Sequence, residues 1–76
     1  MADVAVPDTA WDDDSEGVVS VWFYSDGDNV AAGAVLCELM NEKVASELAA
    51  PCAGRLTVLV PAEAPVRKGQ LVARIE

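Results

Sequence analysis

The chain has 76 residues, and only two of its side chains carry a primary amine, Lys43 and Lys68. Attachment of an acyl group through a stable amide needs such an amine, and lysine presents it on a flexible four-carbon stem. A free lysine amine is protonated at neutral pH, so a ligase must remove the proton and deliver the activated acyl group. Lys43 ends the short polar segment Asn41-Glu42-Lys43, between two more apolar segments. Taken alone, it is most simply explained as a solvated surface lysine.

The other candidates for chemistry are two cysteines, Cys37 and Cys52, and the chain contains no histidine. Without histidine, Ser-His and Cys-His nucleophilic catalysis and most zinc sites are excluded. Two cysteines without a recognisable targeting segment favour buried free thiols in a reducing compartment, with a disulfide as the alternative. We therefore expect a cytoplasmic, bacterial location.

Acidic side chains cluster at Asp12, Asp13, Asp14 and Glu16. A calcium loop needs alternating oxygen ligands and a downstream glutamate at fixed spacing, and this segment has neither. We interpret it as a solvated loop and expect no metal site. The formal net charge of −8 also argues against binding to nucleic acid or to an anionic membrane surface.

The length of the chain predicts a single domain over residues 1–76. A domain of this size buries only about 60% of its unfolded surface, which leaves little room for a substrate cavity. We therefore expect a monomeric module that presents a group to other proteins, without catalytic residues of its own.

Short β-branched and aromatic segments, separated by turn residues, predict about eight strands. The predicted strands cover residues 4–6, 18–24, a short strand at Val30, 35–40, 44–50, 55–60, a short strand at Val66, and 71–75. No segment has the length needed to span a bilayer.

An internal repeat arranges these strands. Residues 17–23 align with 54–60 at an offset of 37, and residues 30–36 align with 66–72 at an offset of 36. One half gives only a thin sheet, so the two halves must pack face to face. The predicted fold is all-β, a flattened barrel or sandwich of two four-stranded antiparallel sheets with quasi-two-fold symmetry. In this fold Lys43 lies at one end of the molecule, and the two termini lie together at the other.

The repeat also predicts the core. The side chains expected inside are Val19, Trp22, Val30, Leu36, Leu39, Leu56, Leu59, Val66, Val72 and Ile75. The step from Val19 to Trp22 breaks strict alternation, so we expect a β-bulge there. Trp11 is expected to cover one edge of the barrel.

The sequence resembles the lipoyl domains of 2-oxo acid dehydrogenase complexes over nearly its whole length. The segments that carry the resemblance are Val4-Ala5-Val6-Pro7, Glu16-Gly17 followed by Trp22, Leu36-Cys37-Glu38-Leu39-Met40-Asn41-Glu42-Lys43-Val44, and Ala50-Pro51 followed by Gly54. Gly27, 16 residues before Lys43, and Gly54, 11 residues after it, match positions where that family keeps glycine. The resemblance implies that Lys43 carries covalently attached lipoate at the tip of a hairpin.

The same fold also serves biotin carriers, so biotin is the alternative cofactor. Biotin carriers typically have methionine on both sides of the target lysine, whereas this chain has Glu42 and Val44, which favours lipoate. Met40 departs from the lipoyl pattern, in which glutamate usually stands three residues before the lysine. A carrier-like binding module without modification is a third interpretation.

The resemblance also implies the partners. A lipoate ligase or lipoyl transferase would modify Lys43. The modified domain would then serve as a swinging arm between a thiamin-dependent 2-oxo acid decarboxylase, an acyltransferase core and the flavoprotein dihydrolipoamide dehydrogenase, as part of an acyltransferase component. The residues expected to form the recognition surface around Lys43 are Met40, Asn41, Glu42, Val44, Asp26, Gly27, Asp28 and Gly54.

Overall fold

The computed structural model describes residues 2–11 and 15–76, and the acidic residues Asp12, Asp13 and Asp14 lie outside the described residues. Within the described residues the chain forms eight strands and no helix. The strands are β1 (Ala2–Ala5), β2 (Gly17–Trp22), β3 (Asn29–Val30), β4 (Val35–Met40), β5 (Ala45–Ala49), β6 (Gly54–Val58), β7 (Pro65–Val66) and β8 (Leu71–Ile75). It follows that the described part of the chain contains no helix that could cross a membrane.

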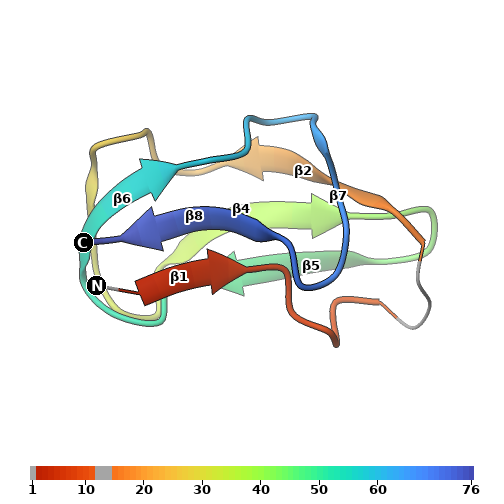
Figure 1. Ribbon diagram of the computed structural model, residues 1–76, viewed down its shortest axis with the longest axis horizontal. Coiled ribbons are helices and arrows are strands. Elements are labelled where there is room, and N and C mark those ends of the chain that lie inside the picture. Colours follow the sequence, from red (N-terminus) through yellow and green to blue (C-terminus); the bar gives the residue numbers. More distant parts are fainter. Residues whose placement is uncertain (1, 12–14) are drawn as a thin grey trace.

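The strands form two four-stranded antiparallel sheets that face each other, one in the order β1-β8-β6-β3 and the other in the order β5-β4-β2-β7 (Figure 1). The two sheets are built in the same order from strands that correspond in the repeat. Strand β6 corresponds to β2, β8 to β4 and β3 to β7. The predicted fold and its quasi-two-fold symmetry are therefore confirmed.

The symmetry extends to the backbone hydrogen bonds that join the two halves. In one half the Gly27 amide donates to the Leu56 carbonyl, at 2.7 Å. In the other half the Glu63 amide donates to the Val19 carbonyl, at 2.6 Å. Each half thus anchors its own turn on a strand of the other half. Such reciprocal bonds explain why neither half forms a closed unit alone.

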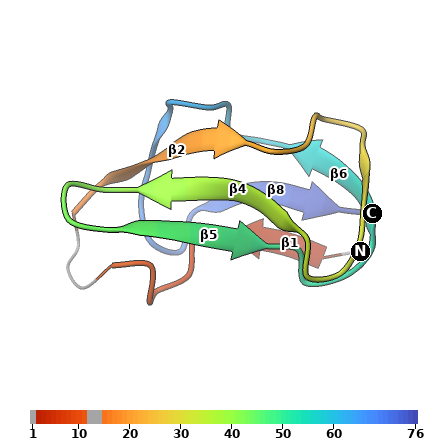
Figure 2. The same cartoon turned by 180° about the vertical axis from the view of Figure 1, so that it is seen from behind.

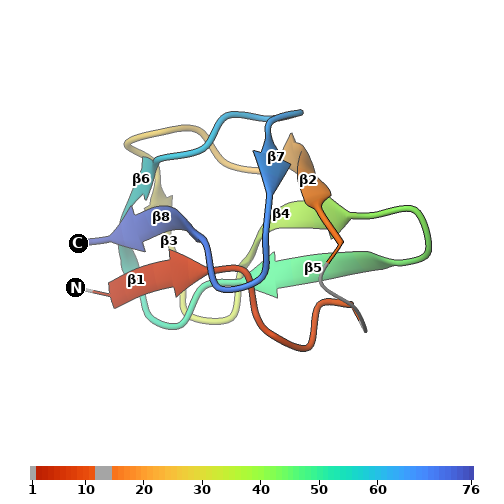
Figure 3. The same cartoon turned by 45° about the vertical axis from the view of Figure 1, so that its right-hand side comes forward.

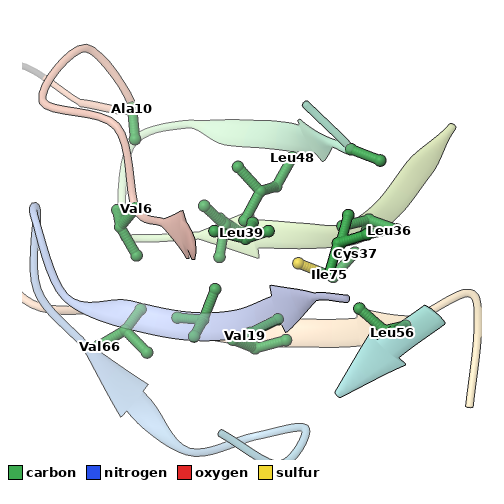
Figure 4. Close-up of a cluster of buried hydrophobic side chains, with 14 of the residues drawn as sticks. Val6, Ala10, Val19, Leu36, Cys37, Leu39, Leu48, Leu56, Val66 and Ile75 are labelled. Atoms are coloured by element: carbon green, nitrogen blue, oxygen red, sulfur yellow. The ribbon is translucent and has the colours of Figure 1, made fainter. Parts of the chain in front are cut away.

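Apolar side chains from both sheets fill the space between them (Figure 4). Of the predicted core, all members except Trp22 and Leu59 are buried. Trp22 is half-buried, packs against the core and donates its indole N–H to the Val60 carbonyl at 2.9 Å. Further buried apolar residues that the sequence did not single out are Val4, Val6, Ala10, Cys37, Leu48, Ala50 and Ala73.

Leu59 corrects the core prediction, because 46% of its surface is exposed. Strand β6 ends at Val58, two residues before the predicted end of this strand. Leu59 lies three residues after the buried Leu56, so strict alternation places it on the outer face, and Val58 and Val60 pack against the core instead. The predicted bulge is confirmed, since the pairing of β2 with β4 shifts register between Val19 and Val21.

Candidate functional site

The hairpin that joins β4 to β5 lies at the opposite end of the molecule from the chain termini (Figure 1). Met40 and Ala45 form the last residue pair of its ladder, and residues 41–44 form the hairpin tip. Figure 3 shows the hairpin extending beyond the neighbouring strands. Glu42, Lys43 and Val44 are all exposed there. The hairpin therefore places Lys43 at an exposed tip at one end of the molecule.

Asn41 holds the backbone of the hairpin tip. Its side-chain oxygen Oδ1 accepts hydrogen bonds from the Lys43 and Val44 amides, both at 2.9 Å. The backbone N–H of Asn41 donates to the Val44 carbonyl at 3.0 Å. Asparagine readily forms such side-chain turns, in which its oxygen replaces a backbone acceptor. The backbone of Lys43 is thus fixed by the residue two positions before it.

The loop between β1 and β2 supports the hairpin tip from the side. Asn41 Nδ2 donates to Ser15 Oγ at 3.3 Å, and the carbonyl of Ser15 accepts the indole N–H of Trp11 at 2.8 Å. Trp11 is only 4% exposed. A Cβ at Gly17 would lie 2.6 Å from the Trp11 ring and 2.6 Å from the Met40 carbonyl oxygen. Glycine at this position therefore allows Trp11 to pack directly against the end of the hairpin.

Trp11 was expected to cover one edge of the barrel, and its burial agrees with that expectation. The contacts by which Trp11 supports the hairpin were not predicted. The only sequence feature that pointed to them was a large aromatic residue in an otherwise polar loop. Ser46 Oγ adds a further link by donating to the Ala10 carbonyl at 3.1 Å.

The second lysine has a different environment. Lys68 is half-buried, and its amine donates to the carbonyl oxygen of Trp11 at 3.3 Å. This contact ties the β1–β2 loop to the segment before β8. Lys68 therefore has a structural role, whereas Lys43 is exposed at a hairpin tip.

The structure brings together only part of the predicted recognition surface. Met40, Asn41, Glu42 and Val44 surround Lys43. The turn Asp26-Gly27-Asp28 does not lie near Lys43, which corrects the sequence-based expectation. Strand β2 pairs Val18 with Met40 beside the hairpin tip and Trp22 with Cys37 farther away, so the turn that follows β2 lies toward the other end.

The acidic turn has a structural explanation instead. Asp26 Oδ1 accepts the Val58 amide at 2.8 Å, and Asp28 Oδ2 accepts the Ser25 amide at 2.8 Å. Gly27 adopts a φ of 91°, in the left-handed region that glycine tolerates best. These contacts shape the β2–β3 turn and attach it to the second half of the chain.

Gly54, which was also predicted to belong to the recognition surface, lies at the end that holds the termini. A Cβ at this position would lie 2.6 Å from the Glu76 carbonyl oxygen and 2.7 Å from Ile75. Glycine is required here because the backbone of β6 passes close to the end of β8. This match to the resembled family thus reflects packing at a site distant from Lys43.

The described surface contains no pocket that could enclose a small molecule, and the described residues include no metal-binding cluster of histidine, cysteine and acidic side chains. Both cysteines are free thiols, as predicted, but only Cys37 is buried and Cys52 is half-buried. Burial of Cys37 raises the pKa of its thiol to about 11, so the group is protonated at neutral pH. The exposed lysine at the hairpin tip is therefore the group best placed for chemistry in the described structure.

A comparison with protein families identifies the family of the chain. The model of the biotin/lipoyl family, described as "Biotin-requiring enzyme", matches residues 2–75. The chain belongs to the biotinyl/lipoyl attachment family. Domains of this family are non-catalytic carriers that hold lipoate or biotin covalently and work with partner enzymes.

Proposed function

We propose that Lys43 is the attachment residue of this carrier domain, and that lipoate is the group attached. The observation that carries the proposal is the contrast between the two lysines. Lys43 is exposed at a hairpin tip whose backbone is held by Asn41, whereas Lys68 is half-buried and bonded to a backbone carbonyl. The first residue is therefore the more accessible of the two to a ligase, and the amine of the second is engaged in a contact with the backbone.

The residues next to Lys43 favour lipoate over biotin. Glu42 precedes the lysine and Val44 follows it, which resembles the acid-lysine-small pattern of lipoyl domains. Biotin carriers typically have methionine at both positions. Met40 lies at the end of β4 with its side chain exposed, so a ligase that recognises this chain must accept methionine three residues before the lysine.

The residues of the chain fit such a group without further binding machinery. An amide bond at Lys43 needs only an exposed amine, and the hydrogen bonds of Asn41 keep the backbone that bears it in one conformation. When bound, lipoate supplies a disulfide that takes up an acyl group together with two electrons. The domain contributes presentation, because a tethered group is held at a high effective concentration near each partner site.

The proposed partners follow from this function. A lipoate ligase or lipoyl transferase modifies Lys43. A thiamin-dependent 2-oxo acid decarboxylase, an acyltransferase core and dihydrolipoamide dehydrogenase then use the modified domain in turn. Each partner must admit the hairpin tip, where Glu42 is exposed beside Lys43. The net charge of −8 favours partner entrances lined by basic side chains.

Enzymatic modification in vitro tests the proposal. The wild-type chain, Lys43→Ala and Lys68→Ala are incubated with lipoate ligase, lipoate and ATP, and in parallel with biotin ligase, biotin and ATP. Intact mass spectrometry should show one lipoyl group on the wild-type chain and on Lys68→Ala, and none on Lys43→Ala. Modification by biotin alone would assign the chain to the biotin carriers. Loss of modification in Lys68→Ala alone would refute the choice of Lys43.

A further inference from the structure

An exposed row of apolar side chains crosses the outer face of the sheet that carries the hairpin. Cross-strand pairs join Pro65 to Val18, Val18 to Met40, and Met40 to Ala45. Directly opposite residues of an antiparallel pair point to the same face, with Cβ atoms about 5 Å apart. These four residues, the apolar row, therefore form one continuous line over β7, β2, β4 and β5. Figure 2 looks onto this face of the sheet.

All four members of the apolar row are exposed. Val18 is 37% exposed and Met40 is 39% exposed, which is unusual for two apolar side chains that face each other across neighbouring strands. Such a continuous patch marks a place where another apolar group gains by covering it.

The apolar row has a defined boundary on each side. The hairpin tip with Lys43 lies on one side. On the other side the next cross-strand pair along the hairpin is Glu38 with Glu47, which places two carboxylates on the same face. An uncharged apolar occupant is therefore confined to the row, because moving farther along the hairpin would bring it against charged groups.

We propose that the acyl chain attached to Lys43 folds back and rests on the apolar row. This inference depends on the proposed function, because it requires that an acyl group is attached to Lys43. Met40, an inner member of the row, ends β4 and lies three positions before Lys43. An aliphatic chain with a sulfur-containing ring, as found in lipoate and biotin alike, matches the apolar character of the row.

Tethering makes such a weak contact effective. A group held on a short flexible linker reaches millimolar effective concentration at neighbouring sites, so it occupies the row without high intrinsic affinity. Amide formation also removes the positive charge of Lys43. The modified side chain is then no longer attracted to nearby glutamate carboxylates. The apolar row is the surface within its reach on which its aliphatic chain can be shielded from water.

The resting position has a consequence for the carrier cycle. An acyl chain on the row is partly shielded from solvent and in equilibrium with an extended form. A partner enzyme must bind the extended form, so the row reduces the fraction of carrier that is ready to react. Met40, where the resembled lipoyl pattern has glutamate, would strengthen this effect in the present chain.

Methyl NMR of the 76-residue chain tests the inference. Spectra are recorded before and after enzymatic lipoylation, and intact mass with peptide mapping first verifies one lipoyl group on Lys43. We expect shifts of the Val18 and Met40 methyl signals, and nuclear Overhauser contacts from Val18 to the methylene groups of the acyl chain. Val21 is the matched control, because it lies on the same strand with similar exposure, 40%, but outside the row. Its signals should not move.

A pair of variants provides the second readout. In the lipoylated double variant Val18→Thr with Met40→Gln, the contacts should disappear and the acyl-chain signals should show faster motion, whereas lipoylated Val21→Thr should behave as the wild type. Lipoylation without any shift at Val18 would overturn the inference while leaving the proposed function intact. Slower ligation of the double variant together with an unshifted Val18 would also overturn it, because the row would then be a docking surface for the ligase.

Discussion

The side-chain oxygen of Asn41 accepts a hydrogen bond from the backbone amide of Lys43 at 2.9 Å, and a second bond from Val44 completes the turn. The same side chain donates to Ser15 through Nδ2. Asn41 thus links three parts of the site, namely the lysine backbone, the start of β5 and the β1–β2 loop. The backbone conformation at Lys43 is thus held by the side chain of this residue.

Asn41→Ala should therefore loosen the hairpin tip. Loss of three exposed hydrogen bonds is expected to lower the free energy of unfolding by about 1 kcal/mol. It should also increase amide hydrogen exchange at Lys43 and Val44 and slow enzymatic lipoylation. Asn41→Asp is the matched control, because it keeps the acceptor oxygen and removes only the donor to Ser15. Equal exchange rates in the Ala variant and the wild type would contradict the role assigned to Asn41.

Gly17→Ala should destabilise the support of the hairpin. The added Cβ would lie 2.6 Å from the Trp11 ring and from the Met40 carbonyl, so one of them must move. Overpacking of this kind costs about 1–3 kcal/mol, measurable by urea unfolding. The indole N–H signal of Trp11 should shift as well. Gly33→Ala is a useful comparison, because a Cβ there would meet nothing within 4 Å. Any loss of stability in that variant comes only from the positive φ of 84°.

Glu63→Gly should stabilise the protein. Glu63 is the repeat counterpart of Gly27, and it adopts a φ of 71° in the left-handed region. A residue with a side chain in this conformation destabilises the folded state by about 1–2 kcal/mol relative to glycine. The greater freedom of glycine in the unfolded chain offsets part of this difference, so the free energy of unfolding should rise by about 0.5–1 kcal/mol. The reciprocal change Gly27→Glu should destabilise the protein. If both changes shift the urea midpoint in the same direction, the equivalence of the two turns is wrong.

Cys37 should make the stability fall in alkaline solution. Its thiol is buried with a pKa raised from 9.0 to about 11, so the folded state binds the proton more tightly than the unfolded state. The resulting stability is fully present below pH 9 and is lost as the pH rises toward 11, by about 2 kcal/mol at the upper limit. Urea unfolding of the wild type and of Cys37→Ala across this range isolates the effect. A parallel decline in both proteins would show that Cys37 is not responsible.

Under the proposed function, Glu42→Lys should slow acyl transfer from a 2-oxo acid decarboxylase to the lipoylated domain, because the exposed acid beside Lys43 would meet the entrance of that partner. The effect should shrink as salt is added. Glu76→Lys is the matched control, since Glu76 is exposed at the end that holds the termini. Reductive acylation rates are the measurement. Equal slowing by both variants would indicate a net-charge effect rather than a local contact.

The internal repeat allowed most of the fold to be predicted. The bounds of β4 and β8 match the predicted segments, and the bulge in β2 follows from the spacing of Val19 and Trp22. Short strands at Val30 and Val66 were also located correctly. A repeat is informative in this way because each half must leave an apolar face that only the other half can cover.

The errors have a common physical cause. The glycine and acid spacing around the Asp26 turn was interpreted as proximity to Lys43, although β4 carries the chain away from that turn to the hairpin tip. Leu59 was assigned to the core from the repeat, although it lies an odd number of residues from the buried Leu56 and so points outward. The support that Trp11 gives to the hairpin depends on its close contact with Gly17, which local periodicity does not encode. Sequence patterns predicted the strands, but not how the connecting segments pack.

The most direct test of the central claim is the mass of the chain as its own cells make it. The protein is purified from its native source, its intact mass is measured, and the peptide that contains residues 41–44 is sequenced by tandem mass spectrometry. The account predicts one lipoyl group, located on Lys43 and absent from Lys68. A biotinyl group on Lys43, or a lipoyl group on Lys68, would contradict it.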